Sequence, residues 1–197
     1  MKILRPAVLT LLASLAGLAS AQTSNWTIDS HHSTAQFTVR HMGISNVSGS
    51  FTQVSGSAVI NDKDITQSQV NALIDVKSVD TRVPDRDNDL RSPNFFDAEK
   101  YPTIEFKSKR IVNNSGKLQM IGDLTMHGTT REVTLDLDAP TEVTDSSGGQ
   151  RRGFSASTTI NRKDFGVVWS HTLKSGEAVV SDSVKIQIDV ELVKKKG

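Results

Sequence analysis

Apolar and polar residues alternate along most of this chain, and this two-residue period constrains the fold more than any other feature. Ala35, Phe37 and Val39, for example, alternate with polar neighbours. Successive side chains of a β-strand point to opposite faces, so each alternating segment predicts a strand with one apolar and one wet face. We find no long helical period and no internal repeat. The segments lie at 35–39, 56–60, 70–76, 104–107, 118–126, 133–137, 154–160 and 184–192.

About eight or nine such strands predict an all-β domain, either an antiparallel barrel or a sandwich. Few charges are placed to protect a sheet edge, and closing the sheet removes its edges, so we expect one eight-stranded antiparallel β-barrel. Such a barrel is filled by side chains or holds one small ligand, as in lipocalins. Small residues at expected inward positions leave both possibilities open, namely Ala35, Ala58, Ala72, Gly122, Ala139 and Ala156.

One long segment, from Arg86 to Tyr101, interrupts the strand pattern. Asp85 or Asp87 is a suitable N-cap for a helical turn, Ser92-Pro93 is a suitable start for a second turn, and Pro102 would end it. The adjacent Phe95 and Phe96 need burial. The sequence therefore predicts a short helical insertion that covers part of the barrel, either as ordinary core or as a lid.

The first residues predict export. Lys2 and Arg5 precede an apolar run from Ala7 to Leu18, and Ala19-Ser20-Ala21 supplies small residues at a cleavage site. The run is short for a membrane span, which needs ~20 apolar residues. We therefore expect residues 1–21 to be a signal peptide and residues 22–197 to form one periplasmic or secreted domain.

Composition excludes some classes of function. The chain has no cysteine, which rules out a lipoprotein anchor and disulfides, so stability must come from a core and a closed hydrogen-bond ladder. Loss of Lys2 and Arg5 would lower the Lys and Arg count from 23 to 21 against 22 acidic residues. Apart from the basic tail at 194–196 no basic stripe is visible, and nucleic-acid binding is disfavoured.

Three motifs in order, HSTAQFTVRHMG, RDNDLRSPNFFDAEKYPTIEF and GDLTMHGTTREV, resemble the YceI-like family of bacterial periplasmic proteins described as binding polyisoprenoids or lipids. The resemblance covers Trp26 to about Glu191. It implies a lipocalin-like barrel with an elongated apolar tunnel, and so favours a cavity over a filled core.

Alternation and the resemblance together give a set of candidate site residues. Arg40, His41, Arg86 and Arg162 could orient a head group, because a phosphate or carboxylate would accept their hydrogen bonds, although each arginine alone is more often part of an ion pair. The side chains expected to line the tunnel are those of Phe37, Val39, Ala72, Ile74, Phe95, Phe106, Leu135 and Ile188.

The energy of apolar burial bounds the ligand. At ~0.8 kcal/mol per buried CH2 group, a short chain barely offsets an association cost of ~4 to 15 kcal/mol. We therefore expect a long-chain isoprenoid, of polyprenyl or quinone type, or another fatty amphiphile. Transient membrane contact and a homodimer both fit this expectation.

The five histidines show no HxH, HExxH or Cys/His spacing, and no GxSxG motif occurs. We therefore expect no metal, no cofactor and no catalysis. Two alternatives stay open. The first is a periplasmic hydrolase or metal-dependent enzyme that uses His41, His127 or His171, and the second is a structural or interaction barrel with a filled core.

Overall fold

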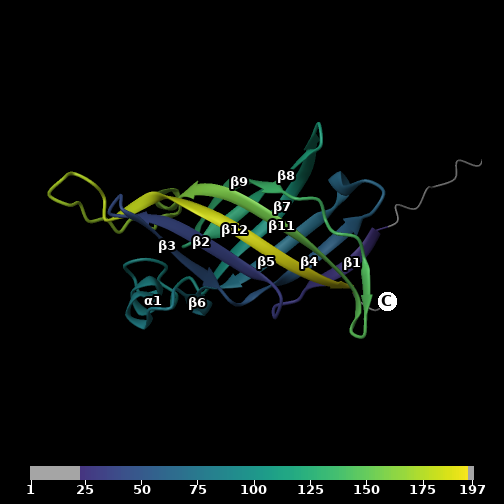
Figure 1. Cartoon of the computed structure of the whole chain (residues 1–197), viewed down its shortest axis with the longest axis horizontal. Coiled ribbons are helices and arrows are strands. Elements are labelled where there is room, and N and C mark those ends of the chain that lie inside the picture. The colour runs from purple at the N-terminus through teal and green to yellow at the C-terminus, as the bar shows by residue number, and fades with distance from the viewer. Residues whose placement is uncertain (1–22, 195–197) are drawn as a thin grey trace, which may run out of the picture.

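The computed structural model describes residues 23–194, more than half of them in strands (Figure 1). The expected signal peptide lies outside the described residues. The helical elements are η1 (Ile65–Gln67), η2 (Val76–Ser78), α1 (Pro84–Arg91) and η3 (Arg162–Phe165). The strands are β1 (Thr23–Ile28), β2 (Thr34–His41), β3 (Ser45–Phe51), β4 (Val54–Asn61), β5 (Gln69–Asp75), β6 (Val79–Asp80), β7 (Thr103–Asn114), β8 (Lys117–Met126), β9 (Thr129–Leu137), β10 (Thr144–Ser146), β11 (Gly149–Asn161) and β12 (Val180–Lys194).

Eight strands form a closed antiparallel ring. The order is β11, β9, β8, β7, β5, β4, β1 and β12, and β12 pairs again with β11 to close it. The antiparallel pairing of β11 with β12 is long and regular, from Arg151 opposite Val193 to Asn161 opposite Ser183. The expected eight-stranded barrel is confirmed, and closure leaves no free sheet edge in this ring.

The remaining strands extend this barrel. β2 continues β1 along the same edge of β12, β3 lies against β2, and β6 lies against β3. Three strands of the ring are thus prolonged past short breaks, at 29–33, 52–53 and 76–78. The alternation pattern did not reveal these breaks, because inward and outward side chains alternate again beyond each of them.

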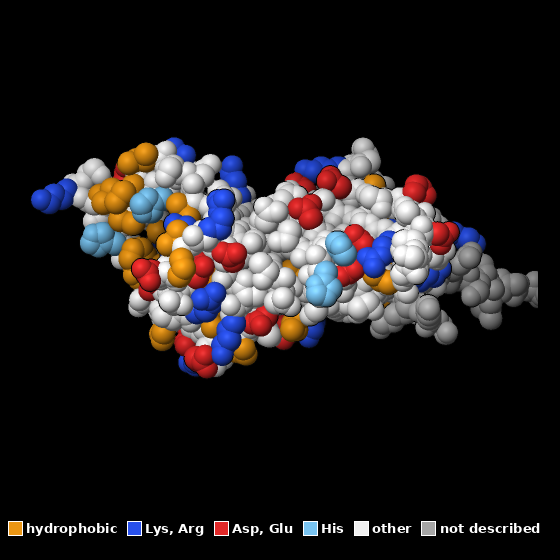
Figure 2. Space-filling model, turned by 60° about the horizontal axis from the view of Figure 1, so that its bottom comes forward, with side chains coloured by type: hydrophobic (Ala, Val, Ile, Leu, Met, Phe, Trp, Pro, Cys, Tyr) orange, Lys and Arg blue, Asp and Glu red, His pale blue; other side chains and the backbone are white. Residues whose placement is uncertain are grey.

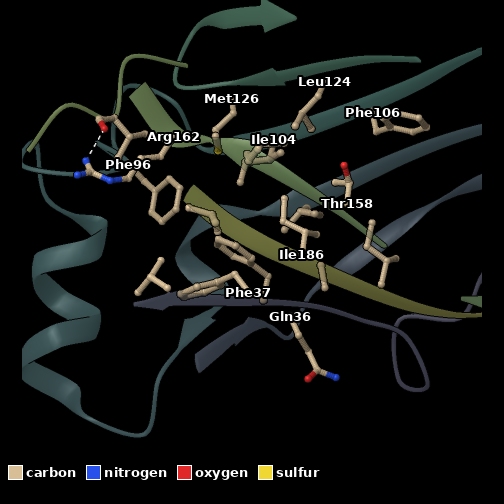
Figure 3. A pocket seen from close by; sticks show the side chains of 18 of the residues that line it. Gln36, Phe37, Phe96, Ile104, Phe106, Leu124, Met126, Thr158, Arg162 and Ile186 are labelled. Atoms are coloured by element: carbon tan, nitrogen blue, oxygen red, sulfur yellow. Dashed lines mark hydrogen bonds between the residues drawn. The ribbon is translucent and has the colours of Figure 1, made fainter. Parts of the chain in front are cut away.

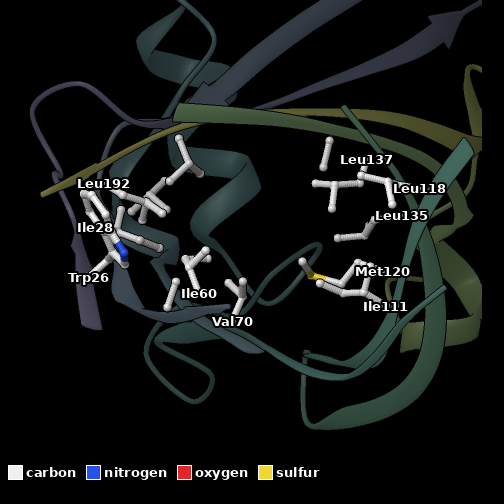
Figure 4. Close-up of a cluster of buried hydrophobic side chains, with 14 of the residues drawn as sticks. Trp26, Ile28, Ile60, Val70, Ile111, Leu118, Met120, Leu135, Leu137 and Leu192 are labelled. Atoms are coloured by element: carbon white, nitrogen blue, oxygen red, sulfur yellow. The ribbon is translucent and has the colours of Figure 1, made fainter. Parts of the chain in front are cut away.

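Two clusters of buried apolar side chains lie in the barrel. At one end Trp26 and Leu192, which are 1% and 0% exposed, pack with Ile60, Ile111, Leu118 and Leu137 from both walls (Figure 4). The second cluster includes Phe51, Val79, Met126 and Phe165. Ala139 was expected to point inwards but is exposed, because β9 ends at Leu137 and its alternation no longer applies.

The inserted segment contains the predicted helix but begins differently. Pro84 is at its first turn and Val83 is the N-cap, with no side-chain cap bond, so the expected capping by Asp85 or Asp87 is wrong. The Asp87 carboxylate instead accepts hydrogen bonds from the backbone N–H and hydroxyl of Thr81, at 2.8 and 2.6 Å. Ser92 ends α1 and also accepts, through its carbonyl, the first bond of the following turn, from Phe95 N–H.

Within 23–194, no helix has the length and apolar character that a membrane span requires.

Candidate functional site

An apolar cavity of about 420 Å³ runs inside the barrel (Figure 3). All eight side chains expected at a tunnel border it: Phe37, Val39, Ala72, Ile74, Phe95, Phe106, Leu135 and Ile188. Seven of them lie on β2, β5, β7, β9 and β12, and Phe95 lies in the inserted segment. The barrel is therefore not filled by side chains at this level. That these residues contact a ligand stays a prediction.

Strand register explains why alternation located these residues. Three directly opposite residue pairs of β11 and β12 border the cavity, namely Ala156 with Ile188, Thr158 with Ile186 and Ile160 with Val184. The same parity applies to β8, where Met120, Leu124 and Met126 line the wall. These β8, β11 and β12 positions were absent from the predicted set although their alternation could have found them.

The cavity is elongated. Both Val180 and Val190 of β12 border it, and ten residues of strand at ~3.3 Å each span roughly 30 Å along the strand. Trp26 and Leu192 do not border the cavity, and their side chains fill the end of the barrel beyond Val190. The other end, near the inserted segment and the loop 166–179, is the mouth.

Two aromatic side chains meet at the mouth. Phe95 stacks on Trp169 with ring centroids 5.3 Å apart and an angle of 28° between the rings, and both border the cavity. Phe96 instead packs edge-on against Phe51, with centroids 5.6 Å apart. Trp169 lies in an irregular loop, so no periodicity pointed to it. The stacked pair joins the inserted segment to the loop 166–179.

The arginine with the most internal bonds at the cavity wall is Arg162, which is 5% exposed (Figure 3). Its guanidinium donates to the Val167 carbonyl at 2.7 Å, to the Ser181 carbonyl at 3.1 Å and to the Asp182 carboxylate at 2.9 Å. Burial lowers the pKa of Arg162, opposed by the charge of Asp182. These bonds tie together the two ends of the loop 166–179, which indicates a structural role.

Arg86 also borders the cavity, but fewer of its donors are used. Its Nε donates to the Thr81 hydroxyl at 2.8 Å and its Nη2 to the Thr81 carbonyl at 3.0 Å. Within residues 23–194 its Nη1 has no hydrogen-bond partner. Asp89 lines the same part of the cavity. Arg86 can therefore donate to a polar group that enters the mouth.

The other two head-group candidates are separated. His41 borders the cavity, whereas Arg40, its neighbour on β2, points to the opposite face and is exposed. Arg40 donates to the Gly43 carbonyl at 3.1 Å and to the Asn46 side chain at 3.3 Å. The structure thus brings His41, Arg86 and Arg162 to the cavity, and leaves Arg40 outside it.

A group of potential metal ligands lies elsewhere. Within residues 23–194, Asp29, His32 and Glu191 have ligand atoms within 4.8 Å of one another. Arg151 donates to Asp29 at 2.6 Å and also to Glu191, so a guanidinium already occupies these carboxylates. The hydrogen bond from Arg151 holds the pKa of Asp29 well below its usual range, with a further contribution from His32.

The three histidines of the enzyme alternative are not in that group. His127 lies in the β8–β9 turn and packs against the Tyr101 ring, with ring centroids 4.5 Å apart. His171 is exposed in the loop 166–179, and His41 borders the cavity. No common catalytic centre for these three follows from their positions.

Comparison with known proteins agrees with this architecture. The family model described as a YceI-like domain matches residues 26–192. A UPF0312 protein of Serratia proteamaculans is 35% identical over 190 residues, which cover 95% of this chain and 96% of the relative. A UPF0312 protein of Vibrio parahaemolyticus is 37% identical over 75% of this chain and 79% of its own.

Solved structures show the same fold. The YceI protein of Campylobacter jejuni has a TM-score of 0.67 at 29% identity, covering 80% of this chain and 90% of its own. BcnA of Burkholderia cenocepacia has a TM-score of 0.69 at 23% identity, covering 83% and 98%. A polyisoprenoid-binding domain from Saccharophagus degradans has a TM-score of 0.59 at 14% identity, covering 86% and 98%. The resemblance read from the sequence is confirmed, and the chain belongs to the YceI-like family.

Proposed function

We propose that this protein binds and carries, or sequesters, a long-chain isoprenoid or another amphiphilic lipid, without chemistry of its own. The observation that carries this proposal is the elongated apolar cavity, which reaches from the mouth deep into the barrel. The Saccharophagus degradans protein of the same fold is described as binding polyisoprenoids, which supports the same class of ligand here.

The shape of the cavity favours a long chain over a short one. Each CH2 group that leaves water for the barrel contributes ~0.8 kcal/mol. A chain long enough to lie along the cavity can therefore exceed the ~4 to 15 kcal/mol cost of association. In this proposal the polar head stays at the mouth, within reach of the Arg86 guanidinium that borders the cavity.

A bulky residue inside the cavity tests the proposal. Ala72 borders the cavity on β5, and its neighbour Leu73 is 40% exposed on the opposite face of the same strand. We expect Ala72→Trp to lower the uptake of a fluorescent polyprenyl probe by about tenfold or more, because the indole occupies the space of the chain. Leu73→Trp is the matched control and should bind like the parent.

Two measurements make this test decisive. Circular dichroism should show the same β-type spectrum for both variants, which establishes that they fold. Native mass spectrometry of the purified parent, followed by organic extraction, should detect a lipid of defined mass. Equal uptake by folded Ala72→Trp and the parent would contradict binding in this cavity, and a stoichiometric metal instead of a lipid would favour the enzyme alternative.

We further propose that the chain is exported and acts in the periplasm or outside the cell. The support for this is the sequence pattern of residues 1–21. Expression of the full chain followed by N-terminal sequencing of the exported fraction tests it. A mature N-terminus at Gln22 is the expected result, and retention of the uncleaved chain in the cytoplasm would contradict it.

A further inference from the structure

Three strongly exposed aliphatic side chains lie on loops at the mouth end of the barrel. Ile44 is 76% exposed in the β2–β3 turn, Val168 is 63% exposed in the loop 166–179, and Val83 is 42% exposed just before α1. Figure 1 shows the β2–β3 turn, α1 and the loop before β12 at the same end of the molecule. In Figure 2, apolar side chains gather at this end.

Specific contacts hold these three loops around the opening. The backbone N–H of Met42 donates to the Val179 carbonyl at 2.9 Å, which places the β2–β3 turn beside the loop 166–179. The stack of Phe95 on Trp169 joins that loop to the inserted segment. Val83 is the N-cap of α1, whose Arg86 and Leu90 border the cavity. The aliphatic tips therefore form a rim around the apolar interior.

Basic side chains accompany each tip. Arg40 bonds to the Gly43 carbonyl next to Ile44, Arg82 precedes Val83, and Lys174 lies in the loop of Val168. Asp85 and Glu177 are exposed nearby, so the local charges largely offset one another. Such a rim is complementary to lipid phosphates through its cations, but its attraction to a bilayer must come mainly from apolar insertion.

Exposed aliphatic side chains distinguish the two ends of the barrel, whereas ion pairs occur at both. Arg152 pairs with Asp62 at 2.6 Å at the end opposite the mouth, and Lys163 pairs with Asp182 at 2.9 Å beside the loop 166–179. Among residues 23–194 the other two exposed large aliphatic side chains are Leu73 on β5 and Val143 just before β10, each 40% exposed and apart from the mouth. The molecule is thus polarised along its long axis, with its apolar tips at the end where the cavity opens.

We propose that the rim formed by Ile44, Val83 and Val168 docks on a lipid bilayer, with the mouth of the cavity against the membrane. This inference rests on the proposed function for its purpose, since a lipid chain that passes directly from the bilayer to the barrel avoids the cost of exposing its CH2 groups to water. Separate aliphatic tips on loops can each enter the interfacial region of a bilayer. A stable protein partner would instead need a continuous patch of about 800 Å².

Vesicle binding tests the docking without any isoprenoid ligand. The protein purified from the exported fraction is mixed with phosphatidylcholine vesicles, with or without phosphatidylglycerol, and separated by flotation. We expect binding to both kinds of vesicle, somewhat stronger with the anionic lipid. The combined variant Ile44→Ser, Val83→Ser and Val168→Ser should bind at least about tenfold more weakly, because it loses most of the inserted apolar area.

The chain provides a matched control. Leu73→Ser with Val143→Ser removes exposed aliphatic area of the same kind outside the rim and should bind vesicles like the parent. All these positions are exposed, and Ser is a favoured N-cap at position 83, so the variants should fold normally. Equal vesicle binding by the rim variant and the parent, or no binding by the parent, would overturn the proposal.

Tryptophan fluorescence gives a second measure. Trp169 lies at the mouth, and Trp26 is 1% exposed at the filled end. Docking should shift the emission of Trp169 to shorter wavelength, and brominated lipid should quench it, while Trp26 responds little. Uptake of a polyprenyl probe from dilute ethanol separates the two proposals. Normal uptake without vesicle binding would contradict the docking proposal and leave the proposed function standing. Vesicle binding without uptake would contradict the proposed function and leave the docking proposal standing.

Discussion

At the scale of single residues, the two arginines of the cavity wall differ in how much of their hydrogen-bonding capacity the protein already uses. Arg162 is buried and bonded to three carbonyls and a carboxylate, whereas Arg86 is partly exposed and bonds only to Thr81. A residue whose donors are already satisfied contributes mainly to stability, and one with a free donor can contribute to binding. The sequence placed both in one group of head-group candidates.

Replacing each arginine with methionine separates these roles. Arg162→Met should lower the free energy of unfolding by about 2 to 3 kcal/mol, less than for a fully buried pair, because Asp182 is 40% exposed. Arg86→Met should instead weaken the binding of a polyprenyl phosphate relative to the neutral polyprenol. Urea unfolding and probe titration measure both quantities for both variants. A loss of phosphate preference in Arg162→Met only would reverse the assignment.

The Asp29–Arg151 ion pair predicts a pH dependence of stability. The hydrogen bond from Arg151 holds the pKa of Asp29 below its usual range in the folded protein. The ionised carboxylate therefore stabilises the fold fully above ~4, which is the pKa of Asp in an unfolded chain, and this stabilisation is lost as the pH falls below that value. Asp29→Asn should therefore be less stable than the parent at pH 7, and the difference should shrink as the pH falls through ~4. The matched control is Asp138→Asn, an exposed carboxylate without an ion pair within 23–194. A difference that stays constant from neutral to acid pH would be inconsistent with this account.

At the scale of elements, the inserted segment contributes to both the core and the mouth. Both phenylalanines border the cavity, but Phe96 packs on Phe51 and against the second buried cluster, whereas Phe95 stacks on Trp169. The buried Asp87 carboxylate fixes the start of the segment through Thr81. Arg91 donates to the carbonyls of Lys77 and Val79, which holds the end of α1 to the barrel.

Single alanine variants of the two phenylalanines test whether the segment acts as a lid. Phe96→Ala should cost about 2 to 4 kcal/mol in free energy of unfolding, because its ring packs on Phe51 and the second buried cluster. It should change ligand release little, because it leaves the stack of Phe95 on Trp169 intact. Phe95→Ala should cost less and speed release by more than its loss of stability explains, because it removes the stack with Trp169. Stopped-flow release of a fluorescent lipid, compared with urea unfolding, measures both effects. Release from Phe95→Ala at the parent rate would rule out a lid that this stack holds closed.

At the scale of the whole molecule, the closed ladder and the two apolar clusters stabilise a chain without cysteine. The two clusters do not fill the barrel completely, because the apolar cavity remains inside it. The ladder of hydrogen bonds around the ring allows this, since a closed barrel keeps its shape without a side chain at every inward position.

Metal removal should leave this molecule unchanged. Within residues 23–194 the one group with metal-ligand spacing, Asp29, His32 and Glu191, already binds Arg151. Exhaustive chelation should therefore change neither the melting temperature nor the uptake of a polyprenyl probe. A fall of several degrees that one equivalent of zinc reverses would contradict this and revive the enzyme alternative.

The sequence by itself determined the all-β class, the closed barrel and the family. Alternation also determined which residues face inwards, as for Phe37, Ala72 and Ile188, because side-chain direction in a strand depends on parity alone. The helical insertion followed from the interruption of that pattern, although its true N-cap, Val83, carries no capping side chain and so gave no signal.

Only the tertiary structure decided the size of the cavity, the position of its mouth and the roles of its polar residues. The stack of Phe95 on Trp169 joins residues far apart in the chain, and Trp169 lies in a loop without periodicity. The bonds of Arg162 depend on where the loop 166–179 returns to the barrel. Local patterns encode the direction of a side chain, but which partners it meets depends on the packing of distant segments, and that information exists only in the folded chain.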